Sequence, residues 1–220
     1  MKARLADFGA QRERMTERQL RRRGISDERV LEAMARIPRE LFVPESQRRR
    51  AYADAALPIA EGQTISQPWI VAAIAQALEL TGDEKVLEIG TGSGYSTCVL
   101  ADLAAEVISL ERHPPLAESA RAVIADLGVG NVEVIVADGS RGLPERAPFD
   151  AIAVHATAPA PPATMLAQLR PGGRLVAPIA SGSADMLTRF RRTEDEFEVE
   201  IIGPCRFVPL IGEEGFGEGG

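Results

Sequence analysis

The segment Val86–Tyr95, with the sequence VLEIGTGSGY, constrains the fold more than any other part of the chain. It begins with a short apolar run that suits a buried strand. Three glycines then stand at alternate positions, Gly90, Gly92 and Gly94, and residues 95–103 follow with the composition of a helix. A strand, a glycine turn and a helix start form a site where bare backbone N–H groups can bind a nucleotide-type cofactor.

The spacing of the glycines narrows the class of cofactor. A dinucleotide fingerprint requires G-x-G-x-x-G, but the third glycine of this chain comes one position too early. The pattern G-x-G-x-G after an acidic residue resembles motif I of the class I S-adenosylmethionine-dependent methyltransferases. We therefore expect a cofactor at this turn, and a purely structural turn is the alternative.

Strands and helices alternate regularly from Lys85 onward. The pattern predicts strands at 85–89, 107–111, 132–136, 149–154 and 173–178, with helices between them at 95–104, 115–127 and 162–169. Such alternation indicates a parallel sheet with helices on both faces. Residues 186–192 and 196–202 are typical of a terminal antiparallel pair. The expected fold class is therefore α/β: a doubly wound, mostly parallel Rossmann-like methyltransferase sheet with N-terminal helices and a C-terminal antiparallel strand pair.

The first part of the chain predicts helices outside this sheet. Residues 1–45 suit two helices, the second beginning at Ser26, and residues 46–67 suit a mostly irregular approach. Pro68 fits the first turn of a helix that runs to about Leu80, because the N–H that proline lacks is unpaired there anyway. We expect one compact unit with three segments, namely 1–67 with the helices and an active-site loop, 68–211 as the cofactor-binding domain, and 212–220 as a flexible Gly/Glu-rich tail.

The composition argues against several classes of protein. Apolar residues make up 45% of the 220 residues, but no apolar run approaches the length of a membrane span. The N-terminus carries no apolar signal region. The two cysteines and two histidines form no metal-ligand spacing. We therefore expect no metal, reduced thiols and a cytoplasmic monomer.

Charge is distributed unevenly along the chain, whose net charge is -7. Residues 1–50 carry 14 Lys+Arg and 8 Asp+Glu, and the remainder is acidic. The basic segment alternates with glutamates and has no interleaved aromatic residues. This favours a charged helix packed on an acidic domain over a nucleic-acid surface. We expect neither nucleic acid nor a membrane as a partner.

Three acidic residues lie at or near the ends of predicted strands. Glu111 ends the second strand, where a carboxylate can accept both hydroxyls of a cofactor ribose. Asp138 and Gly139 end the third strand and suit an adenine, since the acid can accept from the amino group and the glycine leaves room for the ring. Glu88 is expected to orient the glycine loop or, through water, the methionine amine of the cofactor. The alternatives are merely solvated acids and a simple turn.

The chain has few candidate bases. A sulfonium cofactor carries an already activated methyl group, so the protein must place an acceptor behind that methyl and exclude water. A carboxylate acceptor is ionised at neutral pH and needs no general base. His155, just past the fourth strand, can serve as a base, although we expect a substrate contact or a solvated side chain. His113 suits a structural turn.

The stretch GQTISQP, residues 62–68, stands directly before a predicted helix. Thr64 and Ser66 supply hydroxyl donors on either side of Ile65. The helix start adds unpaired N–H groups and the positive end of the helix dipole. Together they suit an anion, such as a carboxylate held opposite the cofactor methyl. A simple N-cap role for Ser66 is the alternative.

From about Arg36 to Leu210 the chain resembles the protein-L-isoaspartate (D-aspartate) O-methyltransferases. The segments that carry the resemblance are IPRELFVP, ALPI, GQTISQP, VLEIGTGSGY, the acid of SLER, VADG, PFDAI, LRPGGRLVAPI and CRFVPL. GQTISQP and RFVPL are the specific ones, whereas VLEIGTGSGY is shared with many methyltransferases. The family has the class I methyltransferase fold and repairs aged proteins by methylating the α-carboxylate of isoaspartyl residues.

The resemblance implies roles for particular residues. Ser66 matches the active-site serine of the family, with Thr64 and Ile65 in the same loop. The matches to cofactor contacts are Gly90, Glu111, Asp138 and Gly139, and the matches to the wall of the substrate pocket are Val208, Pro209 and Leu210. Ala60 and His155 depart from the family pattern, so we expect the substrate contacts at His155 to differ.

These features together predict a repair methyltransferase. It would use S-adenosyl-L-methionine and act on L-isoaspartyl (and D-aspartyl) residues of damaged proteins and peptides. Two alternatives stay open: a related carboxylate methyltransferase that tailors one partner peptide, and a binding module that holds the cofactor without turnover.

Overall fold

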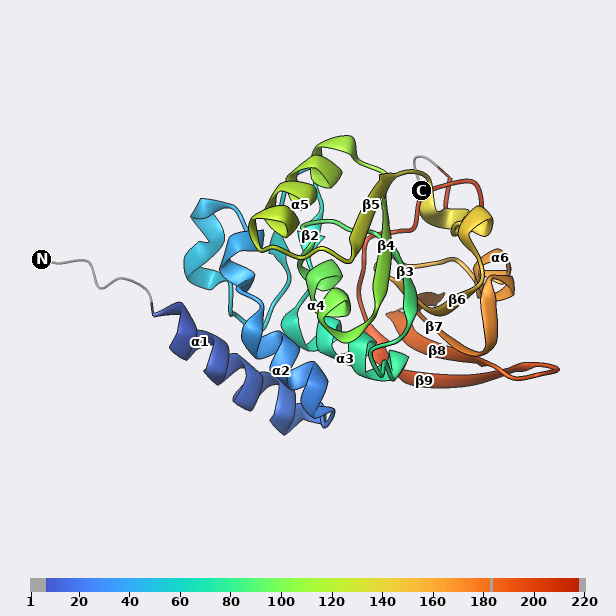
Figure 1. The fold of residues 1–220 in the computed structure, drawn as a ribbon, viewed down its shortest axis with the longest axis horizontal. Coiled ribbons are helices and arrows are strands. Elements are labelled where there is room, and N and C mark those ends of the chain that lie inside the picture. Colours follow the sequence, from blue (N-terminus) through green and yellow to red (C-terminus); the bar gives the residue numbers. More distant parts are fainter. Residues whose placement is uncertain (1–6, 183, 218–220) are drawn as a thin grey trace, which may run out of the picture.

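One sheet of seven strands organises the molecule, in the order β5-β4-β3-β6-β7-β8-β9 (Figure 1). The computed structural model describes residues 7–182 and 184–217. The parallel strands are β3 (Lys85–Ile89), β4 (Glu106–Glu111), β5 (Val132–Val136), β6 (Phe149–Val154) and β7 (Leu169–Ser181). The strands β8 (Ala184–Arg192) and β9 (Phe197–Cys205) add to one edge in antiparallel fashion. The predicted α/β fold class is confirmed.

The strand order reverses between β3 and β6. The chain passes from β3 outward to β4 and β5, then returns to the other side of β3 as β6. Registers Ile89↔Leu110 and Ile89↔Val154 bring the carboxyl ends of β3, β4 and β6 to one level. Ligands of open α/β sheets bind in the crevice at such a reversal.

Alternate residues of the strands fill two cores, because successive side chains of a strand point to opposite faces. Val86 and Val107 pack on the face covered by α3 (Pro68–Leu78), α4 (Tyr95–Leu103) and α5 (Pro114–Asp126). Leu87 and Ile108 pack on the other face with the short α6 (Ala163–Ala167). A parallel sheet buried on both faces explains the near-continuous apolar runs of these strands.

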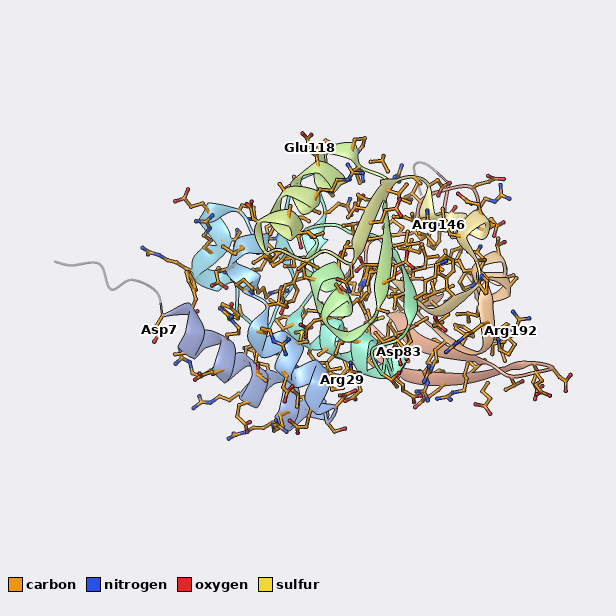
Figure 2. The ribbon with its side chains drawn as sticks, viewed as in Figure 1. Asp7, Arg29, Asp83, Glu118, Arg146 and Arg192 are labelled. Carbon is orange, nitrogen blue, oxygen red and sulfur yellow. The ribbon has the colours of Figure 1, made fainter. Side chains whose placement is uncertain are left out.

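The N-terminal helices cover the first of these faces. The helix α1 (Phe8–Met15) continues through a π turn at Thr16–Leu20 and a 3-10 turn at Arg21–Arg23. The second helix, α2 (Glu28–Arg36), begins after its expected start at Ser26, because the Asp27 side chain accepts from the backbone N–H groups of Arg29 and Val30 as the N-cap. The Arg29 side chain (Figure 2) donates to the Leu80 and Leu103 carbonyls, which ties α2 to the sheet domain.

Some element bounds differ from the sequence prediction for identifiable reasons. The helix predicted at 162–169 ends at Ala167, because Leu169 already pairs with Phe149 as the start of β7. The approach predicted as mostly irregular at 46–67 holds a 3-10 turn at Glu45–Arg50 and the short antiparallel pair β1 (Leu57–Pro58) and β2 (Thr64–Ile65). A 3-10 turn also lies before it at Arg39–Phe42. Further 3-10 turns lie at Gly139–Arg141 and Pro144–Arg146.

The end of the described chain folds back onto the sheet domain. Residues 212–217 are predicted as part of a flexible tail, but this segment forms a turn whose backbone donates hydrogen bonds to Asp138 and Ser140. The remaining tail residues, 218–220, lie outside the described residues. Within the described ranges, no helix has both the length and the apolar character that a bilayer crossing requires.

Candidate active site

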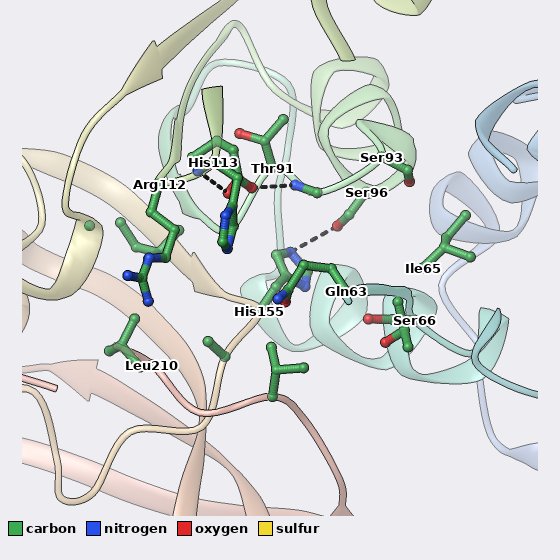
Figure 3. Close-up of a pocket in the computed structure, with 18 of the residues that line it drawn as sticks. Gln63, Ile65, Ser66, Thr91, Ser93, Ser96, Arg112, His113, His155 and Leu210 are labelled. Carbon is green, nitrogen blue, oxygen red and sulfur yellow. Dashed lines mark hydrogen bonds between the residues drawn. The ribbon is translucent and has the colours of Figure 1, made fainter. Parts of the chain in front are cut away.

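A cavity of about 350 Å³ opens at the carboxyl ends of β3, β4 and β6 (Figure 3). It lies where the strand order reverses, and its walls come from six parts of the chain. These are the loop before α3 with α3 itself, the glycine turn after β3 with the start of α4, the end of β4 with the residues after it, Gly139 after β5, the residues after β6, and the segment after β9. The residues that line it are Gly62, Gln63, Thr64, Ile65, Ser66, Val71, Ile89, Gly90, Thr91, Gly92, Ser93, Tyr95, Ser96, Leu110, Glu111, Arg112, His113, Gly139, His155, Ala156, Val208, Pro209, Leu210 and Ile211.

The glycine turn forms one wall of this cavity. Gly90, Gly92 and Gly94 have φ values of 93°, 53° and 85°, which side chains with a Cβ rarely adopt. Gly90 and Gly92 line the cavity, as the sequence predicted. Gly94 is not among the lining residues, and a Cβ there would lie 3.2 Å from the Cβ of Ala120 in α5. Gly94 thus serves the close packing of α4 against α5.

Glu111 closes the edge of the cavity at the end of β4. Its Oε2 atom accepts from the N–H of Gly92 at 2.8 Å, and its Oε1 atom accepts from the N–H of His113 at 2.9 Å. Only 4% of the residue is exposed. A carboxylate has about four acceptor positions, so both oxygens keep acceptor capacity for hydroxyl groups of a ligand.

Asp138 lies beside the cavity, and Gly139 belongs to its lining. The Asp138 carboxylate accepts from the N–H of Ser140 at 2.8 Å and from the N–H of Glu213 at 2.9 Å. Burial favours a higher pKa for Asp138, but these hydrogen bonds and the charge of Arg112 outweigh it and lower the pKa below its ordinary value. Asp138 therefore stays an anion, and its residue remains exposed beside the cavity.

The sequence predicts that Glu88 orients the glycine loop or, through water, the methionine amine of the cofactor, and its side chain does not line the cavity. It is completely buried, and its Oε2 atom accepts from the hydroxyls of Thr97 and Ser109, each at 2.6 Å. Its Oε1 atom lies 3.2 Å from the Nε2 atom of His155. Glu88 therefore reaches the site through the imidazole and through Ser109, whose Oγ atom is 2.5 Å from the Oγ1 atom of Thr91 in the cavity wall.

His155 stands directly after β6, at the centre of the site in Figure 3. Its Nε2 atom is also 2.9 Å from the Oγ atom of Ser96, at the start of α4. Its backbone N–H donates to the Ile89 carbonyl, which fixes the residue beside the glycine turn. The side chain is 6% exposed. The imidazole is therefore held by Glu88 and Ser96 rather than solvated.

The loop before α3 separates this cavity from a second one of about 280 Å³. The second cavity is lined by Arg23, Ala56, Thr64, Ser66, Gln67, Trp69, Ile70, His155, Pro204, Cys205, Arg206, Phe207 and Val208. Four residues line both cavities: Thr64, Ser66, His155 and Val208. A group bound at these four residues is within reach of ligands in both cavities.

Ser66 and the start of α3 form the polar part of this shared wall. The N-cap position of α3 is Gln67, one residue later, so the alternative that Ser66 caps the helix is wrong. The backbone carbonyl of Ser66 accepts from the Nη2 atom of Arg39 at 2.7 Å. Ile65 is buried at 3% exposure and anchors the loop in the core.

Residues 208–210 form the opposite wall. The N–H of Thr157 donates to the Val208 carbonyl and the N–H of Leu210 donates to the Thr157 carbonyl, each at 2.8 Å. These bonds dock the segment against the loop after β6. Val208, Pro209 and Leu210 line the cavity as a result, as the sequence predicted.

Sequence reasoning missed several lining residues. Thr91, Ser93 and Ser96 lie within or just after the glycine turn, so their position in the motif was the available signal. Arg23 and Trp69 meet at the second cavity, where the Arg23 guanidinium lies 5.2 Å from the ring centroid of Trp69. No local pattern signals that pairing, because it joins the N-terminal helices to α3.

The cavities can hold a nucleoside cofactor next to a carboxylate. The first cavity offers bare backbone, the apolar walls Ile89 and Leu110, and the carboxylate of Glu111, with that of Asp138 beside it. Its volume is within the range of about 300–1,000 Å³ for small-molecule sites. A Cβ at Gly139 would approach the Cγ2 atom of Ile89 to 2.7 Å, so only glycine fits there. The residues present therefore fit a ligand with a flat ring, a diol and an amino group.

Comparison with known proteins shows extensive similarity to one family. A family model described as protein-L-isoaspartate(D-aspartate) O-methyltransferase matches residues 10–215. Protein-L-isoaspartate O-methyltransferase 1 of Rhodopseudomonas palustris is 54% identical over 95% of this chain and 86% of its own length. The protein-L-isoaspartate O-methyltransferase of Methanoculleus marisnigri is 51% identical over 94% of each chain.

Solved structures agree with this similarity. A protein-L-isoaspartate O-methyltransferase superposes with a TM-score of 0.80 at 29% identity, covering 92% of this chain and 66% of that longer chain. A putative enzyme of the same kind from Plasmodium falciparum superposes with a TM-score of 0.78 at 25% identity, over 91% of this chain and 98% of that one. The Plasmodium structure contains S-adenosyl-L-homocysteine.

Proposed function

The chain belongs to the protein-L-isoaspartate (D-aspartate) O-methyltransferase family, and we propose that it repairs damaged proteins by methylating them. The methyl group moves from S-adenosyl-L-methionine to the α-carboxylate of L-isoaspartyl and D-aspartyl residues. The single observation that carries this function is the pair of cavities that meet at Thr64, Ser66, His155 and Val208. One cavity suits the cofactor, and the other suits a peptide.

The residues of the first cavity hold the cofactor. Glu111 accepts the ribose hydroxyls, while Gly90 and Gly92 let the backbone approach the ligand. Asp138 accepts from the adenine amino group, and Gly139 lines the cavity beside it. When bound, S-adenosylmethionine supplies a methyl group already activated by its positively charged sulfur.

Ser66 and Thr64 hold the acceptor carboxylate at the shared wall. Their hydroxyls are hydrogen-bond donors, and the start of α3 adds the positive end of a helix dipole. His155 contacts the bound peptide beside them, and Val208, Pro209 and Leu210 form the facing wall. A carboxylate is ionised at neutral pH, so these residues position the acceptor and exclude water without acting as a base.

The residues of the two cavities come from two segments of the chain. Residues 1–67 contribute the N-terminal helices and the active-site loop, and residues 68–211 contribute the cofactor-binding domain. The described ion pairs and hydrogen bonds between them, including Arg36–Asp102 and Arg29–Leu103, support a single folding unit. We propose that this unit works as a cytoplasmic monomer, and sedimentation equilibrium tests the oligomeric state.

Methyl transfer to paired peptides tests the proposed function. Two peptides of identical composition, one with an isoaspartyl residue and one with the normal aspartyl residue, are incubated with the enzyme and S-adenosylmethionine labelled in the methyl group. We expect base-labile methyl ester on the isoaspartyl peptide alone. Equal labelling of the two peptides would overturn the repair function.

Neither alternative would label the generic peptides, and further measurements distinguish the two. A methyltransferase that tailors one partner peptide would label neither generic peptide but would retain S-adenosylhomocysteine formation with its own partner. A binding module would bind S-adenosylhomocysteine in a calorimeter and label nothing. His155 departs from the family pattern and lines the peptide cavity. That departure is the reason to test the first alternative, a methyltransferase that tailors one partner peptide.

A further inference from the structure

The end of the described chain forms a compact turn beside the first cavity, which we call the C-terminal turn and define as residues 211–216. Its backbone closes on itself: the N–H of Phe216 donates to the Leu210 carbonyl at 2.7 Å, and the N–H of Gly215 donates to the Gly212 carbonyl at 3.1 Å. Ile211 and Phe216 form an isolated parallel bridge. The turn is therefore an ordered element of the structure.

This turn is bound to the acid at the end of β5. The N–H of Glu213 donates to the Oδ2 atom of Asp138 at 2.9 Å, and the N–H of Glu214 donates to the Oγ atom of Ser140 at 3.1 Å. The N–H of Ser140 in turn donates to the Oδ1 atom of Asp138 at 2.8 Å. Each oxygen of the carboxylate is thus fixed by one backbone N–H group, which sets both the direction and the rotation of the side chain.

The C-terminal turn packs so closely on Asp138 and on its own backbone that no side chain fits at two of its glycines. A Cβ at Gly212 would lie 2.1 Å from the Oδ1 atom of Asp138 and 2.5 Å from the Oγ atom of Ser140. A Cβ at Gly215 would lie 2.1 Å from the Leu210 carbonyl oxygen. By contrast, a Cβ at Gly217 would meet no atom within 4 Å. Glycine is required at the first two positions and not at the third.

We infer that the C-terminal turn positions Asp138 to recognise the amino group of the cofactor's adenine. The inference rests on the proposed function, in which Asp138 accepts from that amino group. Both hydrogen bonds from the backbone use one acceptor position each, so the carboxylate keeps further positions for the ligand. Without the turn, Asp138 loses the Oδ2 contact and is free to rotate away.

The side chains of the C-terminal turn contribute less to holding Asp138 in place than its backbone N–H groups do. Arg141 forms ion pairs with Glu213 at 3.3 Å and with Glu214 at 3.9 Å, but these side chains are largely exposed. Exposed pairs of this kind contribute little. Substituting Glu213 by alanine keeps the N–H that Asp138 accepts, whereas displacing the backbone removes it.

Two ligands distinguish recognition of the amino group from simple closure of the cavity. S-Adenosylhomocysteine carries the amino group, and S-inosylhomocysteine carries a carbonyl oxygen in its place, which cannot donate to Asp138. Dissociation constants of both are measured by calorimetry for the unsubstituted chain, Gly212→Ala and Gly215→Ala. Gly217→Ala is the matched control, and Glu213→Ala tests the side chain. Thermal unfolding without ligand shows whether each variant is folded.

We expect Gly212→Ala and Gly215→Ala to raise the dissociation constant of the adenosyl ligand about tenfold, the value of one charge-assisted hydrogen bond. The dissociation constant of the inosyl ligand should change by less than about twofold in both variants. Gly217→Ala and Glu213→Ala are expected to leave both constants within about twofold. An equal loss for both ligands would overturn the inference, because the turn would then only close the cavity. Unchanged binding of the adenosyl ligand in folded Gly212→Ala would overturn it as well. Absence of adenosyl binding in the unsubstituted chain would instead refute the proposed function.

Discussion

The Nη2 atom of Arg39 donates a 2.7 Å hydrogen bond to the backbone carbonyl of Ser66. Arg39 is fully buried, and its Nε atom donates to the Ala51 carbonyl at 2.7 Å while its guanidinium lies 4.8 Å from the ring centroid of Tyr95. Its Nη1 atom has no hydrogen-bond partner among the described residues. Burial lowers the pKa of Arg39 to about 10, so the guanidinium is still charged at neutral pH. A buried cation thus holds the loop that carries the proposed catalytic serine.

Arg39→Lys should impair both stability and catalysis. A lysine carries a single ammonium and cannot reach both carbonyls, so one buried acceptor loses its partner at a cost of about 2 kcal/mol in the free energy of unfolding. The displaced loop should lower kcat about tenfold or more. Urea unfolding and single-turnover transfer measure the two effects. Arg36→Lys is the matched control, because the Arg36 ion pair with Asp102 is exposed on the arginine side and should change stability by less than about 1 kcal/mol.

Ser66→Ala should slow methyl transfer far more than it weakens cofactor binding. Loss of one hydrogen bond to a charged acceptor corresponds to about 10- to 100-fold in rate. The dissociation constant of S-adenosylhomocysteine should stay within about twofold. Transfer to the isoaspartyl peptide and calorimetry are compared on the same preparation. An equal loss in both measurements would assign Ser66 to the cofactor rather than to the acceptor.

Glu111→Gln should have the reverse effect. The amide keeps the size of the side chain and one acceptor oxygen, but it cannot accept two ribose hydroxyls while also accepting from Gly92 and His113. We expect the dissociation constant of S-adenosylhomocysteine to rise about tenfold, with kcat at saturating cofactor changed much less. A lower kcat with unchanged cofactor binding would contradict the ribose role.

His155→Thr should destabilise the protein through Glu88. The substitution leaves a completely buried carboxylate with hydroxyl donors but without the imidazole, which should lower the free energy of unfolding by about 3 kcal/mol. The double variant Glu88→Gln/His155→Thr removes the charge and should recover part of that loss. Urea unfolding of both variants and of Glu88→Gln provides the comparison. Additive losses would show that the two side chains are not coupled.

The two thiols should make the protein sensitive to alkaline pH. Burial raises the pKa of Cys98 to about 12, with a smaller contribution from Glu88, and burial raises the pKa of Cys205 to about 11. The folded state therefore keeps both thiols protonated at a pH where the unfolded state ionises them. Their contribution to stability is complete below about pH 9 and is lost as the pH rises through the folded pKa values.

Thiol reactivity and unfolding measure this behaviour. At pH 8 an aromatic disulfide reagent should react slowly with the native protein and rapidly after unfolding in urea. Between pH 9 and 11 the free energy of unfolding should fall less steeply in a Cys98→Ala variant. An equal slope in that variant would remove Cys98 from the explanation.

The sequence was sufficient to predict the parts of the site that follow from local pattern. Gly90, Glu111 and Gly139 each stand at or just after the end of a strand, and parallel strands bring their carboxyl ends to one edge of the sheet. The alternation of apolar strands with helices therefore predicted that these three residues lie close together. The ends of β3, β5 and β6 match the predicted ranges, whereas β7 spans 169–181 instead of the predicted 173–178.

The remaining features depend on contacts between distant parts of the chain. Glu88 reads as a ligand-facing acid beside the glycines, but the pleat of β3 points it into the core toward Thr97 and Ser109. The hydrogen bond from Glu213 to Asp138 joins residues 75 positions apart in the sequence. The glycine-rich composition of residues 212–220 by itself indicates a flexible tail. Arg39 lies in a segment that shows no periodicity, so its burial beneath Ser66 had no local signal.

The proposed ligand contacts occupy the ends of β3, β4 and β6, and these same strand ends also contribute to the core. Ile89 and Leu110 line the cavity and are buried core residues as well. His155 also serves both purposes, because it lines the two cavities and lies 3.2 Å from the buried carboxylate of Glu88. A substitution at these strand ends is therefore expected to change ligand binding and fold stability together.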